Sequence, residues 1–384
     1  MNKFDLQRQY YPVLAHRSFL NSAQNGLIPT YAADAMCQFV QNRSLNALDL
    51  QSMDAQWDDA LTIRARIGRM LHCGADEICF GPSASALFNI FSNGIGLQPG
   101  DNVVTYDTAY HSTLFTWYNK EQDGVEVRIA KNKNGWMPAE DLIALCDERT
   151  RAISISLVDY GTGYRHDVRT LGEYCRSHGI YLTVDATQCC GAMKIDVEEM
   201  KIDFLITSIY KWLQGMLGLG FAYIHRPLLD SLKQVDMGWT NVRDRRNISD
   251  EALDISPDAN RFEYGGISFV ALAGLKKVLD AYLKLGADDI EEYILSLVEY
   301  AYEKAAELKH VEVLGGCFPK EHRSGIVTLL FPEDWPITPE YLYEHCIGAM
   351  PMGKGKCRIA IHYYNNKEDI DRFFAMLKEL DDNV

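Results

Sequence analysis

Apolar and polar positions predict helices that alternate with strands along most of the chain. From about residue 53, apolar residues recur at helical spacing in 55–71, 86–97, 112–121, 138–146 and 168–178. Short apolar runs separate and follow these segments, at 77–80, 102–106, 125–130, 151–156, 180–185, 203–208 and 219–225. The short runs are apolar throughout rather than alternating, which is typical of a sheet buried on both faces. Strands that alternate with helices predict parallel βαβ units and an α/β fold.

The pattern changes after about residue 237. Residues 237–262 carry few apolar side chains, and two long helices are expected at 268–284 and 288–309. Strands at 311–314, 325–331 and 357–361 and a helix at 366–380 complete an α+β arrangement. Because 384 residues exceed the roughly 250–300 that one core supports, we expect two domains. Residues 20–240 are assigned to the large domain, and 1–19 with 241–384 to the small one.

Composition narrows the functional classes. The chain has 38 Lys and Arg against 53 Asp and Glu, a net charge of −15, which disfavours binding to nucleic acid or to anionic lipid. The first residues show no signal peptide, and no apolar stretch reaches the ~20 residues of a membrane helix. The ten cysteines are scattered without a C-x-x-C pair, so we expect reduced thiols, no metal site and a cytoplasmic location.

Two charged residues follow consecutive buried strands. Asp185 ends the run at 180–185, and Lys211 lies 26 residues later, after the run at 203–208. Open α/β sheets bind ligands at the carboxyl ends of their strands. A lysine buried there has a lowered pKa, as a Schiff-base lysine requires, and a carboxylate would hold a pyridine nitrogen protonated. The alternative is that Asp185 caps a helix and Lys211 extends its ammonium to solvent.

The segment GPSASALFN (81–89) joins a predicted strand to a predicted helix. Its small residues would let backbone N–H groups at the helix N-terminus approach an anion, with hydroxyls from Ser83 and Ser85. Ser208, three residues before Lys211, could close such a site from the opposite side. A plain serine N-cap explains the segment equally well.

Together these motifs resemble the class V aminotransferase family of fold-type-I pyridoxal-phosphate enzymes, which includes cysteine desulfurases, selenocysteine lyases and isopenicillin N epimerase-like proteins. The resemblance runs over nearly the whole chain, through FLNSAQNGLIP (19–29), GPSASALFN, TAYHSTLFTW (108–117), VDATQ, SIYKW, RFEYGG (261–266) and CRIAIHYYNNKEDID (357–371). It implies a mostly parallel seven-stranded sheet between helices, the cofactor pyridoxal 5′-phosphate, and a homodimer with active sites at the subunit interface.

The resemblance also implies residue roles. Lys211 matches the Schiff-base lysine that moves the Cα proton, Asp185 the partner of the pyridine nitrogen, and Gln188 the partner of the phenolic oxygen. The phosphate contacts match Ala84, Ser85 and Ser208.

Some positions depart from the family pattern. Tyr110 replaces the histidine that often stacks on the cofactor ring, Tyr210 the histidine before the lysine, and Tyr160 an asparagine near the ring oxygen. Gly266 replaces a threonine that reaches the partner subunit's phosphate, and Ser268 could compensate.

The same resemblance assigns Arg358 to the substrate's α-carboxylate, a role that suits its planar fork. A surface salt bridge is the alternative. Asn25, together with Gln24, Trp239 and Asn241, is a candidate for the side-chain pocket, with loop packing equally open.

The reaction itself is left open by these residues. Amino-group transfer on a small α-amino acid is the leading expectation, C–S or C–Se β-lyase activity follows, and epimerisation is third. A catalytically inactive scaffold is the alternative from another class. Persulfide chemistry would need Cys346, which lacks the family's flanking pattern, while Cys189 and Cys190 are expected to be buried packing residues.

Overall fold

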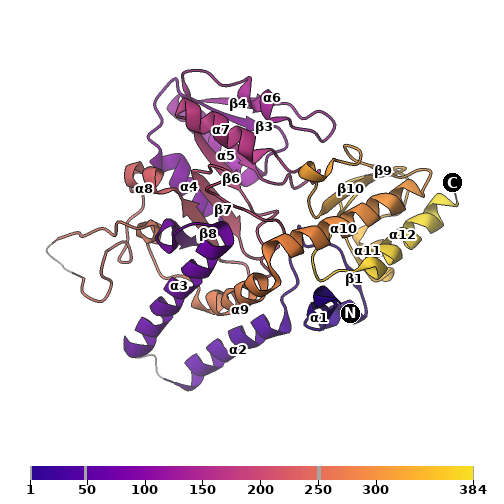
Figure 1. Cartoon of the computed structure of the whole chain (residues 1–384), viewed down its shortest axis with the longest axis horizontal. Coiled ribbons are helices and arrows are strands. Elements are labelled where there is room, and N and C mark those ends of the chain that lie inside the picture. Colours follow the sequence, from indigo (N-terminus) through magenta and orange to yellow (C-terminus); the bar gives the residue numbers. More distant parts are fainter. Residues whose placement is uncertain (1, 47–49, 249–251, 384) are drawn as a thin grey trace.

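The large sheet has seven strands in the order β2-β8-β7-β6-β5-β3-β4 (Figure 1). This computed structural model describes residues 2–46, 50–248 and 252–383. The strands are β2 (Ile78–Gly81), β3 (Asn102–Tyr106), β4 (Glu126–Ala130), β5 (Thr150–Ser156), β6 (Tyr181–Asp185), β7 (Phe204–Ser208) and β8 (Gly220–Ile224). Neighbouring strands run parallel except β8, which is antiparallel to both β2 and β7. The predicted α/β fold with a mostly parallel seven-stranded sheet is confirmed.

Successive residues of the strands point into two separate apolar clusters, one on each face of the sheet. Phe204 and Ile206 of β7 join the cluster that contains α4 (Ala84–Gly94) and α5 (His111–Lys120). Leu205, between them, joins the cluster that contains α7 (Val168–His178). Both faces are therefore covered by helices, which is why central strands such as β7 and β8 are buried at every position. The helices α3 (Leu50–Leu71), α6 (Ala139–Ile143) and α8 (Arg226–Ser231) complete this layer arrangement.

The C-terminal third builds a smaller antiparallel sheet in the order β12-β13-β10-β9. Its strands are β9 (Glu312–Val313), β10 (Ile326–Leu330), β12 (Met350–Pro351) and β13 (Lys356–Ala360), with α10 (Ala287–Ala306), α11 (Pro339–Glu344) and α12 (Lys367–Asp381) around them. The N-terminal arm joins this part, because β1 (Ser18–Phe19) pairs with β11 (Ile347–Gly348). Arg8 at the end of α1 (Lys3–Arg8) also binds Asp369 of α12, at 2.7 Å. The domain limits at 19/20 and 240/241 stay a prediction.

Helix α2 (Thr30–Leu45) was not expected from the sequence. Only Ala32 and Met36 of its side chains are buried, so it shows no continuous apolar stripe. It forms by packing on α9 (Phe269–Leu285), where Gly274 lies directly beneath the Met36 side chain. Short 3-10 helices lie in the connections, at Pro12–Ala15, Ala75–Glu77, Glu121–Asp123, Ala259–Phe262 and Lys320–His322. Within the described ranges, none of the helices combines the length and apolar composition that a bilayer crossing requires.

Candidate active site

A cavity of about 220 Å³ lies at the carboxyl ends of the central strands. Strand β6 ends there with Asp185, β7 ends with Ser208 just before Lys211, and β5 ends with Ser156. The connection from β2 to α4 and the start of α5 close the remaining sides. The lining residues are Ser83, Ala84, Ser85, Tyr110, Ser112, Ser156, Tyr160, Asp185, Thr187, Gln188, Ser208, Tyr210, Lys211 and Leu217. The sheet thus brings together most of the residues that the sequence singled out.

Lys211 is buried in this cavity with two aromatic rings beside it. Its Nζ lies 5.3 Å from the ring centroid of Tyr110 and 5.7 Å from that of Tyr210. Burial lowers the pKa of the Lys211 ammonium to about 8, although the carboxylate of Asp185 opposes this and Arg358 adds to it. At pH 7 about a tenth of the Lys211 side chains, and at pH 8 about half, therefore carry the neutral amine, the form that bonds to an aldehyde.

Asp185 is buried at the end of β6 and fixed by the loop that follows. The backbone N–H of Thr187 donates to Asp185 Oδ1 at 2.9 Å. Burial raises the pKa of the Asp185 carboxyl, while the hydrogen bonds from Thr187 and the charge of Lys211 pull it down. A positive charge beside this carboxylate would offset the cost of burying its negative charge, and a protonated pyridine nitrogen is such a charge.

The N-terminus of α4 forms an anion cradle with hydroxyls from two other segments, β7 and α5. Ser83 caps the helix by accepting from the N–H of Ala86 at 3.1 Å. The N–H of Ala84 donates to Ser208 Oγ at 3.2 Å, and Ser85 Oγ donates to Ser112 Oγ at 2.8 Å. Helix N-termini with free N–H groups and hydroxyls bind phosphate groups well, because both the dipole and the donors favour an anion.

Arg358 lies in the middle of β13, next to the cavity wall, and is buried. Its Nη1 donates to the carbonyl oxygen of Tyr160 at 2.6 Å, and its Nε has no hydrogen-bond partner among the described residues. Among those residues, no carboxylate lies within 4.0 Å of the guanidinium. The surface salt bridge considered from the sequence is therefore wrong. A buried cation without a counter-ion destabilises the folded protein unless an anion, such as a bound ligand, neutralises it.

The phenols of Tyr160 and Tyr210 line the cavity in their protonated form, because burial raises the pKa of both. The Tyr110 and Tyr160 rings pack edge to face, with centroids 5.3 Å apart. Gln188 is also buried in the wall, with its side-chain Oε1 accepting from Trp212 and its Nε2 donating to Ala23.

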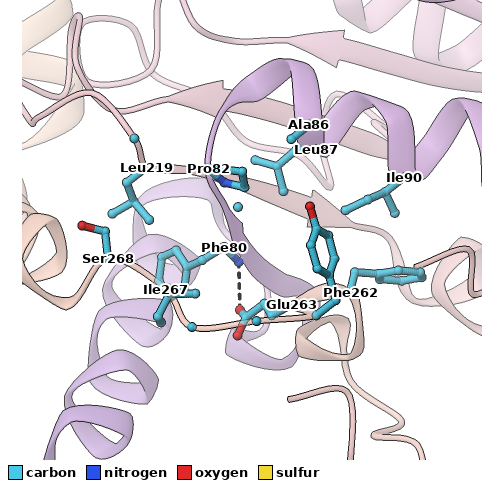
Figure 2. A pocket seen from close by; sticks show the side chains of 15 residues that line it. Phe80, Pro82, Ala86, Leu87, Ile90, Leu219, Phe262, Glu263, Ile267 and Ser268 are labelled. Carbon is cyan, nitrogen blue, oxygen red and sulfur yellow. Dashed lines mark hydrogen bonds between the residues drawn. The ribbon is translucent and has the colours of Figure 1, made fainter. Parts of the chain in front are cut away.

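Gly266 and Ser268 are not in this cavity. They line a second, mostly apolar cavity of about 140 Å³ behind the cradle, shown in Figure 2. Glu263 lies at its floor and accepts a hydrogen bond from the N–H of Phe80 at 2.8 Å. The predicted contact of Gly266 is with the cofactor of a partner subunit, and it stays a prediction.

The four residues considered for a substrate side-chain pocket do not line the cavity. Asn25 and Gln24 are exposed and do not line the cavity, although the next residue, Gly26, packs so closely on Lys211 that a Cβ would overlap the lysine carbonyl oxygen. Trp239 packs edge to face on Trp57, with ring centroids 6.2 Å apart. Asn241 is buried, and its side chain accepts from the N–H of Gly238 and donates to the carbonyl oxygen of Arg261, so loop packing describes it.

Ser112, Thr187, Ser156 and Leu217 line the cavity but were not singled out from the sequence. Thr187 lies inside the VDATQ motif, and Ser112 follows Tyr110 by two residues at a helix start, so both carried a positional signal. Thr187 Oγ1 accepts from the N–H of Ser208 at 3.2 Å and thereby joins the ends of β6 and β7.

Comparison with known proteins agrees with this geometry. The model of the family described as aminotransferase class-V matches residues 19–373, and the chain belongs to this family. A probable cysteine desulfurase of Methanothermobacter thermautotrophicus is 24% identical over 97% of each chain. An uncharacterized aminotransferase of Schizosaccharomyces pombe is 28% identical over 79% of this chain and 77% of its own length.

Solved structures share the fold at lower identity. A cysteine desulfurase from Thermococcus onnurineus NA1, in its apo form, superposes with a TM-score of 0.88 at 22% identity, covering 100% of this chain and 99% of its own. The cystine C–S lyase C-DES, in complex with its product cysteine persulfide, superposes with a TM-score of 0.88 at 19% identity, covering 96% and 98%.

Family membership confirms the cofactor prediction, and the cavity fits pyridoxal 5′-phosphate. The lysine amine, the buried carboxylate of Asp185 and the anion cradle at α4 lie around one space, as an aldehyde, a pyridine nitrogen and a phosphate on one molecule require. The chain is therefore a pyridoxal-phosphate enzyme of the class V aminotransferase family.

Proposed function

We propose that this enzyme acts on a small α-amino acid and cleaves the bond between Cβ and sulfur or selenium. The observation that carries the substrate class is Arg358, a buried guanidinium that has no carboxylate partner and an unused Nε within the described ranges. An amino-acid carboxylate would supply the missing anion through paired N–H···O bonds. The relatives named as cysteine desulfurases support cleavage of sulfur-containing substrates.

Each residue of the cavity has a separate task in this proposal. The cradle at Ala84, Ser85 and Ser208 holds the phosphate, and the face of Tyr110 packs on the ring. Bound pyridoxal phosphate supplies an electron sink for the pair that remains when Cα loses its proton. Asp185 keeps the pyridine nitrogen protonated, and the Lys211 amine takes the Cα proton.

We propose that the sulfur is released directly from the substrate, as sulfide or as a persulfide, and that it is not transferred to a cysteine of the enzyme. All ten cysteines are described, and none lines the cavity. Cys189 and Cys190 are buried, and burial raises their thiol pKa, to about 12 for Cys190, so neither is a ready nucleophile. Cys346 is exposed just before β11, where its carbonyl accepts from the N–H of Ser18.

Amino-group transfer is the second candidate. It was the leading expectation from the sequence, and the Schizosaccharomyces pombe relative named as an aminotransferase favours it at 28% identity. The two reactions share Cα proton removal at Lys211 and differ in what leaves next.

The test is an anaerobic incubation of the loaded enzyme with cysteine, cystine and alanine in parallel. Pyruvate and released sulfide or persulfide are assayed, and the cofactor absorbance is followed in the same sample. We expect pyruvate and sulfur products with an unchanged cofactor band, in wild type and Cys346→Ser alike. Bleaching to the amine form of the cofactor, reversed by a keto acid, would instead establish a transaminase. Loss of sulfur release in Cys346→Ser would contradict the proposed route.

We further propose that the chain works as a cytoplasmic homodimer. Large apolar side chains are exposed near the two cavities, at Met216, Leu217 and Tyr264, and association would cover them. The ten free thiols fit a reducing compartment. Sedimentation equilibrium should give twice the chain mass of 43.5 kDa, and Leu217→Asp should weaken the association.

A further inference from the structure

The indole of Trp212 is hydrogen-bonded to the amide of Gln188. Trp212 Nε1 donates to Gln188 Oε1 at 3.0 Å, and Gln188 Nε2 donates to the carbonyl oxygen of Ala23 at 3.0 Å. Both side chains are buried, and Gln188 lines the cofactor cavity. Trp212 is the residue directly after Lys211, so the contact is built into the same loop as the reactive amine.

The chemistry of these two neighbours fixes the orientation of the amide. An indole N–H can only donate, so the atom of Gln188 that faces it must be the oxygen. A backbone carbonyl can only accept, so the atom that faces Ala23 must be the nitrogen. If the amide rotated by 180°, its nitrogen would face the indole N–H, donor against donor, and its oxygen would face the Ala23 carbonyl, acceptor against acceptor. One N–H of Gln188 Nε2 is left over for a ligand in the cavity.

Trp212 is itself held from the small sheet side. Its ring stacks on His362 with centroids 5.4 Å apart, and its carbonyl accepts from His362 Nε2 at 3.0 Å. His362 Nδ1 accepts from the N–H of Tyr363 at 2.8 Å, which sets the tautomer, and burial lowers the imidazole pKa to about 4. A Cβ on Gly325 would lie 2.6 Å from the indole ring, so the backbone packs tightly on its edge.

We propose that Trp212 is a positioning residue that orients the Gln188 amide so that its free N–H donates to the phenolic oxygen of the bound cofactor. The inference rests on the proposed function for the presence of the cofactor and its bond to Lys211, and it adds a residue that does not line the cavity. Without the indole N–H, only the carbonyl oxygen of Ala23 holds the amide, so its second N–H is no longer fixed toward the phenolic oxygen.

The consequence is measurable in the absorbance of the loaded enzyme. A donor to the phenolic oxygen draws negative charge away from it, and that charge otherwise stabilises the proton on the nitrogen joining Lys211 to the cofactor. Loss of the donor therefore raises the pH at which the visible band of the loaded enzyme titrates. The net contribution of one hydrogen bond corresponds to a shift of about 0.5–1 pH unit.

The experiment compares the titration midpoints of five loaded proteins, the wild type and four variants. Trp212→Phe removes the indole N–H, and Gln188→Leu removes the amide while leaving Trp212 intact. We expect both to raise the midpoint by about 0.5–1 pH unit, with no further rise in the double variant. The matched control is Trp117→Phe, because Trp117 is equally buried and its Nε1 has no hydrogen-bond partner among the described residues. Its midpoint should equal that of wild type.

The outcomes separate the inference from the function that it builds on. A wild-type midpoint in Gln188→Leu overturns the inference, whether or not Trp212→Phe folds. An equal shift in Trp117→Phe, or an additional shift from Trp212→Phe in the Gln188→Leu background, also overturns it. Failure of the wild-type protein to bind pyridoxal phosphate and show a titrating band would overturn the proposed function itself.

Discussion

The hydroxyl of Thr108 donates a hydrogen bond of 2.8 Å to Oδ2 of the buried Asp159. The other oxygen of that carboxylate accepts from the N–H groups of Gly161 at 2.8 Å and Thr162 at 2.7 Å. Thr108 precedes Tyr110 by two residues, and the turn after Asp159 carries Tyr160, whose carbonyl holds Arg358. One carboxylate therefore joins the loop beside the cofactor ring to the turn that orients the proposed carboxylate clamp.

Replacement of Asp159 by alanine is expected to raise KM for the amino-acid substrate more than it lowers kcat. The turn that orients Arg358 loses three hydrogen bonds. A loss of about one or two kcal/mol in substrate binding at Arg358 then raises KM roughly 5–30-fold. Asp159→Asn keeps Oδ1 for both N–H groups and should stay within about threefold of wild type. Steady-state kinetics of both variants provide the check. Equal KM values in Asp159→Ala and wild type would refute this role.

The sequence was sufficient for the central sheet because its strands are buried on both faces and carry a continuous apolar signal. It also placed Asp185 and Lys211 at the ends of β6 and β7, since strand ends follow directly from strand positions. Helix α2 escaped prediction because a tertiary contact, not an apolar stripe, stabilises it.

Side-chain contacts between residues far apart in the sequence could not be predicted from it. Nothing in the sequence shows that Asn241 binds the backbone of Arg261, that Arg358 has no counter-ion among the described residues, or that Trp212 donates to Gln188. Each depends on how side chains from separate segments pack, and spacing along the chain carries no information about that.

The rate of cofactor uptake should rise with pH around a midpoint near 8. Burial lowers the pKa of the Lys211 amine to about 8, and only the neutral amine attacks the cofactor aldehyde. At pH 7 the neutral fraction is then roughly 300-fold larger than for an ordinary lysine. Stopped-flow absorbance of cofactor-free protein mixed with pyridoxal phosphate measures the profile. Asp185→Asn removes the negative charge that raises the pKa of Lys211, so the midpoint of this variant should move to lower pH. A midpoint near 10 in the wild-type protein would contradict the lowered pKa of Lys211.

Loss of the Glu263 carboxylate should destabilise the fold by about 3–5 kcal/mol, the usual cost of breaking a buried ion pair. Glu263 Oε1 pairs with Arg64 at 2.5 Å and Oε2 with Arg245 at 3.2 Å, and the Glu263 side chain has no exposed surface. Glu263→Ala leaves the buried guanidinium of Arg64 and the partly buried guanidinium of Arg245 without their shared carboxylate. Urea unfolding measures the change. The control is Asp254→Asn, whose pair with Arg243 is exposed and should contribute less than about 0.5 kcal/mol.

Substitution of Arg358 should impair only substrates that carry an α-carboxylate. A bidentate, charge-assisted contact contributes about 1.5–3 kcal/mol, so Arg358→Ala should lower kcat/KM by roughly 10- to 150-fold. Arg358→Lys restores the charge without the fork and should recover only part of this loss. The matched comparison uses cysteamine, the cysteine analogue without a carboxylate, whose binding to the loaded enzyme should be equally weak in wild type and Arg358→Ala. Equal losses for cysteine and cysteamine would show that Arg358 supports the small sheet, where β13 pairs with β10 and β12, and does not bind the substrate.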